Sequence, residues 1–219
     1  MTLRITYAHL LGGRATVSVA EVEQESGPAL TFTADAKSEG FFAWLLRFRV
    51  DDHTVATWDP ASGCSLGIEK HLREGRAARD HVMRIDPLTG VAEVEDAKIK
   101  EKRFELAACT LDVLSAFFVT RIRGVPEAEP LVLPVFDNGE RFKLGVRFLG
   151  RERLDLPAPF GKNYPTLVIE PQLLAGTGLF VKAGRLKIWL SDDARRVPVR
   201  MRAKVAIGSV SADLESYRN

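Results

Sequence analysis

Several residue patterns that would announce a particular chemistry are missing from this chain of 219 residues. No serine lies in a Gly-x-Ser-x-Gly nucleophile elbow, and Gly176-Thr177-Gly178 lacks the strand–loop–helix setting of a phosphate-binding loop. No stretch approaches the roughly 18 consecutive apolar residues of a membrane-spanning helix. Acidic pairs such as Asp192 and Asp193 fall in turn-like, solvated stretches. We therefore expect no catalytic residue and no cofactor, and the chain is predicted not to be an enzyme.

Cysteine and histidine are both scarce. The two cysteines, Cys64 and Cys109, lie too far apart in the sequence to form a structural zinc site. We expect two buried thiols, and a disulfide between them is the alternative that an oxidising compartment would favour. The histidines form no zinc-like pair on a helix, so they are expected to be surface or cross-strand partners rather than metal ligands. They are His9, His53, His71 and His81.

The first residues resemble the start of a strand rather than a targeting signal. Met1-Thr2-Leu3-Arg4-Ile5 has neither the basic leader nor the apolar core of a signal peptide. Two locations are therefore left open. The protein is cytoplasmic if Met1 is its native start, and exported if a leader has been removed.

Charge is nearly balanced, with a formal net charge of +2, but it is unevenly distributed. Residues 141–204 contain 14 Lys and Arg against 5 Asp and Glu, which gives +9 and leaves −7 for the remainder. The simplest interpretation is that these charges cover solvated strand faces. The alternative is a basic patch for anionic head groups, formed by Arg200, Arg202 and Lys204. Aromatic residues do not alternate with these cations, so no nucleic-acid partner is expected.

Period-two alternation of apolar and polar residues dominates the chain. It is clearest at residues 30–37, 141–148 and 197–205. One buried and one solvated face is typical of antiparallel sheet, whereas parallel strands are apolar throughout. Turn sequences separate the runs, and Asn138-Gly139 is the strongest of them because a tight hairpin needs positive φ at its centre. We expect about ten to twelve strands in one domain that spans residues 1–219.

Two segments interrupt the strand pattern. Residues 110–123 are predicted to form a helix that Thr110 caps and Gly124 ends. Its apolar stripe contains Leu111, Leu114, Phe118 and Ile122, and Phe117 widens it. The second segment, residues 40–46, is too apolar for an ordinary loop, and it forms either part of the core or the wall of an apolar cavity.

Blocks spread over nearly the whole chain resemble a bacterial family known as domain of unknown function 3108. The first blocks are Val50-Asp51-Asp52, Trp58-Asp59-Pro60, Asp112-Val113-Leu114-Ser115-Ala116 and Leu133-Pro134-Val135-Phe136-Asp137. The C-terminal blocks are Gly178-Leu179-Phe180, Gly184-Arg185-Leu186-Lys187-Ile188-Trp189-Leu190-Ser191-Asp192-Asp193, Val197-Pro198-Val199, Gly208-Ser209-Val210 and Tyr217.

What this resemblance implies is a fold and a location rather than an activity. Members are typically exported proteins of bacteria with two membranes, so a periplasmic location is implied. Their architecture is similar to that of lipoprotein carriers of the LolA/LolB kind. The implied fold is a strongly curved antiparallel sheet, a half-barrel, with a helix packed on its concave face over an apolar cavity. Candidate cavity-lining residues are then Phe41, Phe42, Trp44, Leu45, Leu114, Phe117, Phe118, Leu179 and Phe180.

Three functions remain after these considerations. The leading hypothesis is a non-enzymatic, monomeric protein of the cell envelope that binds or shuttles a lipid, lipoprotein or other amphiphile, with an anionic membrane surface as a further partner. The alternative is an assembly module of the envelope whose core is filled. The third is a small-molecule enzyme that uses the cavity.

Overall fold

The computed structural model describes residues 1–7, 10–24, 27–39, 49–157, 160–176, 186–205 and 208–218. The whole of the apolar segment 40–46 lies outside this described part, and so do Leu179 and Phe180. The strands before the helix are β1 (Thr2–Tyr7), β2 (Leu10–Gln24), β3 (Gly27–Ser38), β4 (Asp51–Asp59), β5 (Cys64–Glu74), β6 (Ala77–Asp86), β7 (Val91–Asp96) and β8 (Arg103–Glu105). After helix α2 (Val113–Arg123) come β9 (Leu131–Asp137), β10 (Glu140–Leu154), β11 (Tyr164–Gly176), β12 (Leu186–Ser191), β13 (Pro198–Val205) and β14 (Gly208–Ser216).

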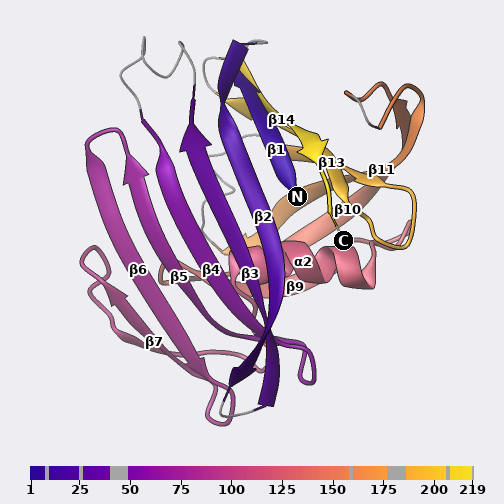
Figure 1. Cartoon of the computed structure of the whole chain (residues 1–219). Coiled ribbons are helices and arrows are strands. Elements are labelled where there is room, and N and C mark those ends of the chain that lie inside the picture. The colour runs from indigo at the N-terminus through magenta and orange to yellow at the C-terminus, as the bar shows by residue number, and fades with distance from the viewer. Residues whose placement is uncertain are drawn as a thin grey trace.

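All these strands belong to one antiparallel sheet of 14 strands in the order β8-β7-β6-β5-β4-β3-β2-β1-β14-β13-β12-β11-β10-β9. Figure 1 shows how β1 and β14 bring the two ends of the chain together in the middle of this sheet. The predicted curved sheet is confirmed, although it has more strands than expected. One reason is that β8 has only three residues, too few for an alternating pattern to be recognised.

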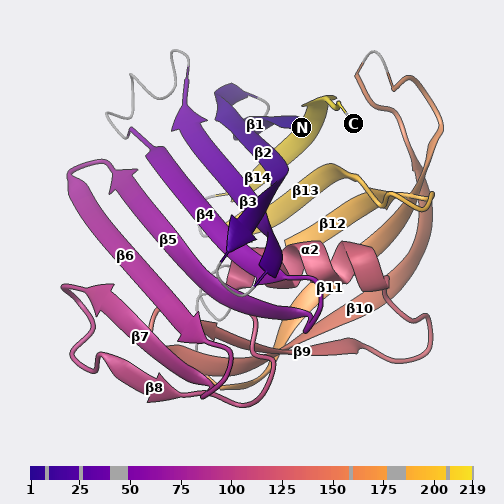
Figure 2. The same ribbon diagram turned by 60° about the horizontal axis from the view of Figure 1, so that its bottom comes forward.

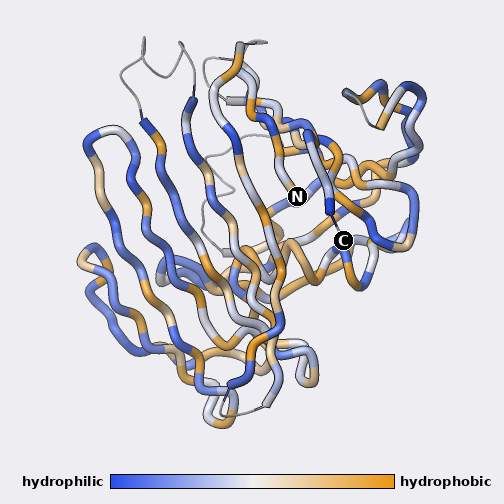
Figure 3. Tube along the Cα trace, viewed as in Figure 1, coloured by the Kyte–Doolittle hydropathy of each residue, from blue (hydrophilic) through white to orange (hydrophobic). Residues whose placement is uncertain are grey.

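The sheet curls around α2 without closing into a barrel, so β8 and β9 remain its edges (Figure 2). Hydrophobic and hydrophilic residues alternate along the strands on one side of the molecule, as Figure 3 shows. The hairpin turn between β9 and β10 is also as predicted, with φ of 53° at Asn138 and 80° at Gly139.

Helix α2 fills the middle of the concave face. Phe118 is buried and stacks on Phe32 of β3, with ring centroids 4.0 Å apart. The helix ends at Gly124, as expected, with φ of 74° and its N–H bonded to the carbonyl of Thr120. Ile122 is 56% exposed, so the apolar stripe is shorter than its sequence pattern indicated. The prediction of one helix packed on the inner face is confirmed.

The predicted cap of this helix was wrong. Asp112 is the N-cap, and its carboxylate accepts hydrogen bonds from the backbone N–H groups of Leu114 and Ser115 at 2.8 and 2.9 Å. Thr110 instead donates its hydroxyl to the carbonyl of Ala107. Both residue types cap helices well. The choice of Asp112 follows from a tertiary contact with Ser65, whose hydroxyl donates to the Asp112 carboxylate at 2.6 Å.

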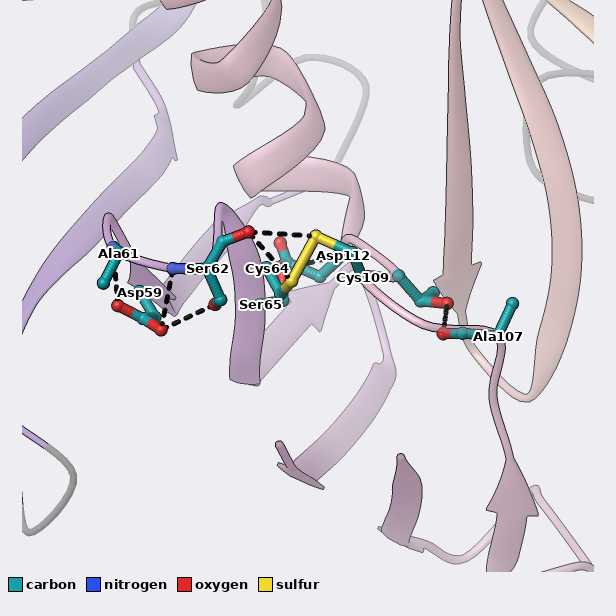
Figure 4. Close-up of a disulfide and its surroundings, with 9 residues drawn as sticks. Asp59, Ala61, Ser62, Cys64, Ser65, Ala107, Cys109 and Asp112 are labelled. Carbon is teal, nitrogen blue, oxygen red and sulfur yellow. Dashed lines mark hydrogen bonds between the residues drawn. A yellow bond between two sulfur atoms is a disulfide. The ribbon is translucent and has the colours of Figure 1, made fainter. Parts of the chain in front are cut away.

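The expectation of two free thiols was also wrong, because Cys64 and Cys109 form a disulfide (Figure 4). Cys64 is the first residue of β5, and Cys109 precedes the segment that leads into α2. Next to the disulfide, the carbonyl of Thr110 accepts a hydrogen bond from the Ser65 N–H. The sequence alone gave no sign that the fold brings these cysteines together.

The segment after the disulfide joins the two halves of the curled sheet. Leu111 forms a parallel bridge with Val135 of β9, and its N–H donates to the carbonyl of Pro134 at 3.0 Å. Because Thr110 is bonded to β5 at the same time, this segment spans the space between β5 and β9. It fixes where α2 begins and covers part of the β9 edge.

Candidate functional site

A cavity lies between the inner face of β3–β6 and the first turn of α2. Its volume is about 470 Å³, which falls in the range of roughly 300–1,000 Å³ typical of small-molecule sites. We call it the helix cavity. Its apolar wall comes from Ala34, Leu72, Ala77, Val113 and Leu114. Its polar wall comes from Thr54, Lys70, Glu74, Arg79, Lys98, Asp137 and Asn138.

The inner face of the sheet changes from apolar to polar between two neighbouring rows of residues that run across the strands. The first row lies in the core with Phe118 and is apolar. It consists of Phe32, Ala56, Ile68, Met83 and Val94, all buried. The second row is displaced by two residues along each strand and becomes polar. It consists of Ala34, Thr54, Lys70, His81 and Asp96.

Lys70 crosses the interior to form an ion pair with Asp137, the last residue of β9. The two side chains are only 7% and 3% exposed. Asn138 donates a further hydrogen bond to the Asp137 carboxylate at 2.7 Å. Removing one partner of such a buried pair typically costs 3–5 kcal/mol because the other charge stays behind without compensation. The pair therefore holds β5 and β9 together at the wall of the cavity.

His81 and Asp96 form the deeper part of the polar row. Asp96 Oδ2 lies 3.0 Å from His81 Nδ1 and 2.7 Å from Arg79 Nε. Burial would raise the pKa of Asp96, but hydrogen bonds from the Lys98 N–H, Arg79 and His81 outweigh it and lower that pKa. Burial and then the charge of Lys70 lower the pKa of His81, so the imidazole is neutral and donates from Nδ1 to the carboxylate.

The charges at the cavity are largely compensated. Lys70 and Arg79 each have a carboxylate partner, while Lys98 is exposed and forms no ion pair with any residue that the structure describes. His81 Nε2 and Asn138 Oδ1 are buried without a hydrogen-bond partner in the described part of the chain. The arrangement suits an apolar group along Leu114 with a polar group near Lys98.

A family model described as a protein of unknown function, DUF3108, matches residues 2–215. The chain belongs to this family. Among solved structures, the chain is similar to the crystal structure of a beta-barrel-like protein of domain of unknown function DUF1849 from Brucella abortus, with a TM-score of 0.60 and 12% identity. The match covers 100% of this chain and 97% of that chain. At such low identity the likeness shows the fold alone. No curated protein sequence matches the chain.

The helix residues of this DUF3108 chain that were expected to line one cavity lie in two different places. Leu114 lines the helix cavity. Phe118 lies in the filled core, and Phe117 packs against it edge-on, with ring centroids 5.6 Å apart. The remaining candidates lie outside the described residues: Phe41, Phe42, Trp44, Leu45, Leu179 and Phe180.

The basic patch does not lie at the mouth of this cavity. Met201 of β13 opposes Ile188 and packs in the core around α2, so the residues before and after it point to the outer face of the sheet. Arg200, Arg202 and Lys204 therefore lie on the opposite side of the sheet from the helix cavity. Arg200 also forms an ion pair with Asp213.

The histidines lie on both faces of the sheet. His53 and His71 are cross-strand neighbours on the outer face with parallel rings 6.3 Å apart, whereas His81 lies inside. Hydrogen bonds that its ring donates to the carboxylates of Asp80 and then Glu69 raise the pKa of His71. Within the described residues, no cluster of three or more His, Cys, Asp or Glu has a geometry that suits a metal ion. No helix in that part of the chain is long and apolar enough to cross a membrane.

The sequence analysis missed the polar residues that shape the cavity. One signal was available, because Lys70 occupies the position where alternation from Ile68 to Leu72 requires an apolar residue. Asp137 stands directly before the Asn138-Gly139 turn, a position that gives no sign that its side chain is buried. Only the curl of the sheet brings these two residues together.

Proposed function

We propose that this chain is a non-enzymatic protein of the bacterial cell envelope that binds an amphiphile in the helix cavity. The apolar part of the ligand lies against Leu72, Val113 and Leu114. Its polar head lies near Lys98 and the Lys70–Asp137 pair. The observation that carries the proposal is a cavity of about 470 Å³ that both apolar and charged side chains line.

The volume of the cavity supports a single-chain ligand. Each methylene group that leaves water contributes about 0.8 kcal/mol, so a short acyl chain is sufficient for measurable affinity. The stack of Phe118 on Phe32 fills the neighbouring space. A lipoprotein cargo of the LolA/LolB kind would present one of its acyl chains to this same cavity.

The Cys64–Cys109 disulfide supports an envelope location. Disulfides persist in oxidising compartments such as the periplasm and are rare in the cytosol. The proposed location is therefore the periplasm.

An assembly module with a filled core is the second candidate. The packing of α2 favours it, because Ala116, Phe118 and Val119 are buried in one continuous core. In that case the helix cavity would hold water only. The proposal of a small-molecule enzyme ranks third, since the more deeply buried cations of the cavity, Lys70 and Arg79, are held in ion pairs.

A cavity-filling variant tests the binding proposal. Leu114→Trp places a large side chain in the helix cavity, and Ile122→Trp on the exposed side of the same helix is the matched control. Binding of dodecanoate is measured by calorimetry, and co-purified ligand by native mass spectrometry. The Trp side chain of Leu114→Trp takes the space of two or more ligand methylene groups, each worth about 0.8 kcal/mol of binding. Binding should therefore weaken by at least about tenfold.

The control variant should bind like the unmodified protein. Equal dodecanoate binding by Leu114→Trp and Ile122→Trp, both folded, would contradict the assignment of the cavity. Absence of any bound ligand and of any dodecanoate affinity would favour the filled-core module.

A further inference from the structure

Three cations gather on the outer face of the sheet, away from the helix cavity. Lys187 of β12 stands directly opposite Arg202 of β13, and Lys204 follows Arg202 on the same face. All three side chains are exposed. We call this group the basic face. Figure 1 shows β13 beside β14, and its other neighbour in the strand order is β12.

The basic face lacks the carboxylates that accompany other cations on this side of the sheet. Arg200 pairs with Asp213, and Arg14 pairs with Glu39 and Glu215. None of the basic-face residues forms an ion pair with another residue of the described part of the chain.

Small neutral residues surround the basic face on the next strand. Arg202 donates a hydrogen bond to the hydroxyl of Ser211, and Lys204 opposes Ser209. Like charges directly opposite each other on adjacent strands destabilise a sheet. The Lys187–Arg202 pair therefore costs stability in the free protein, and an anionic surface would relieve that cost.

The outer face carries the opposite charge at its other end. Across β3 to β7 it presents carboxylates on every strand, and they outnumber the cations Lys37, Arg73 and Arg84 that pair with some of them. Among these carboxylates are Asp35, Asp51, Glu69, Asp80, Glu93 and Glu95. An anionic surface attracts the β12–β13 end and repels the β3–β7 end, so the charge pattern fixes an orientation.

We propose that the basic face docks this protein onto an anionic lipid surface. Its three cations stand on a pleated sheet surface outside the helix cavity, which suits a broad array of head groups rather than one buried phosphate. A single-stranded nucleic acid would need aromatic rings to stack on. The neighbouring Trp189 is buried and donates its Nε1–H to Glu152, so it is not available for stacking.

Docking in this orientation turns the inner face, and the helix cavity with it, away from the lipid surface. Docking and ligand uptake are therefore separate events, measured separately. The inference shares with the proposed function only the envelope location. A protein that fails to bind dodecanoate can still dock, and one that fails to dock can still bind dodecanoate.

The test compares two triple variants that lose the same charge. Lys187→Gln/Arg202→Gln/Lys204→Gln removes the basic face. Arg76→Gln/Lys100→Gln/Arg103→Gln removes three exposed cations from the β5–β8 end of the molecule. Binding is measured by co-sedimentation with vesicles of phosphatidylcholine alone or mixed with phosphatidylglycerol. Each cation near an anionic surface contributes about fivefold in partitioning, so losing the basic face weakens binding about a hundredfold.

The expected result is binding to the mixed vesicles alone, weakened by salt, lost in the basic-face variant and kept in the control variant. Equal losses in the two variants would overturn the proposal, because net charge alone would then explain binding. Absence of binding to the mixed vesicles by the unmodified protein would overturn it as well. Tighter binding to a soluble polyanion, heparin, than to the vesicles would assign the face to another partner and overturn the lipid assignment.

Discussion

Breaking the Cys64–Cys109 disulfide tests how the two halves of the sheet are joined. The bond links the first residue of β5 to the segment that leads into α2. In that segment Thr110 is hydrogen-bonded to β5 and Leu111 to β9. Without it, only hydrogen bonds and packing hold that segment across the interior. We therefore expect a large loss of stability from Cys64→Ser/Cys109→Ser, or from reduction of the unmodified protein.

The size of the loss follows from the loop that the bond closes. Cys64 and Cys109 are 45 residues apart in sequence. In the chain-entropy model a cross-link over a loop of this length removes about 13 cal/mol/K from the unfolded chain, or about 4 kcal/mol at 25 °C. With a urea dependence of about 3 kcal/mol/M, the unfolding midpoint falls by about 1.3 M.

Urea unfolding followed by circular dichroism, with and without a reductant, measures the effect. A thiol titration gives the state of the cysteines in each sample. The serine variant should unfold at the midpoint of the reduced protein and should not respond to reductant. The reasoning is refuted if both thiols become reactive and the midpoint of the unmodified protein stays where it was.

Three further predictions concern the inner face and the histidines. Phe118→Ala should lower the free energy of unfolding by about 3–5 kcal/mol. Phe117→Ala should lower it by less, because Phe117 is only half-buried. Urea unfolding compares the two variants, and equal losses would contradict the packing described. Gly67→Ala should cost about 1–3 kcal/mol in the same assay, because its Cβ would lie 2.4 Å from a carbonyl oxygen of β6; an unchanged midpoint would contradict that contact. His81 has a lowered pKa, so the unfolded chain takes up the proton first and stability falls as the pH drops below about 6.5. His71 has a raised pKa and contributes in the opposite direction. When the pH falls from about 7.5 to about 5.5, His81→Gln should therefore lose less stability than the unmodified protein, and His71→Gln should lose more. Urea midpoints at both pH values give the sign of each effect. A nuclear magnetic resonance titration of each ring checks the directions of the two pKa shifts.

The strands and turns of this protein follow from local patterns. A strand with one face in the core repeats every two residues, and that repeat needs no knowledge of the partner strand. Tight turns are equally local, since positive φ at Asn138 and Gly139 is a property of those residue types. The curved sheet was therefore predictable, with the family resemblance supplying its curvature.

Pairing across long distances was not predictable in the same way. Thr110 and Asp112 are both good caps, and the choice depended on Ser65, which is 47 residues away from Asp112 in the sequence. The disulfide depended on the same long-range approach of β5 to the helix. The polar half of the helix cavity had a similar origin, because Lys70 meets Asp137 only after the sheet has curled.

The filled centre of the concave face limits how long a bound chain can be. A ligand that extends beyond Leu114 towards the middle of α2 must displace Phe118 from Phe32, whose loss costs about 3–5 kcal/mol. Affinity for fatty acids should therefore rise by about 0.8 kcal/mol per methylene from hexanoate upward and level off once the helix cavity is full. Calorimetry over the series from hexanoate to hexadecanoate measures the curve. A rise that continues to the longest chain would mean that the aromatic stack opens, and a flat line without affinity at any length would leave the filled-core module as the better description.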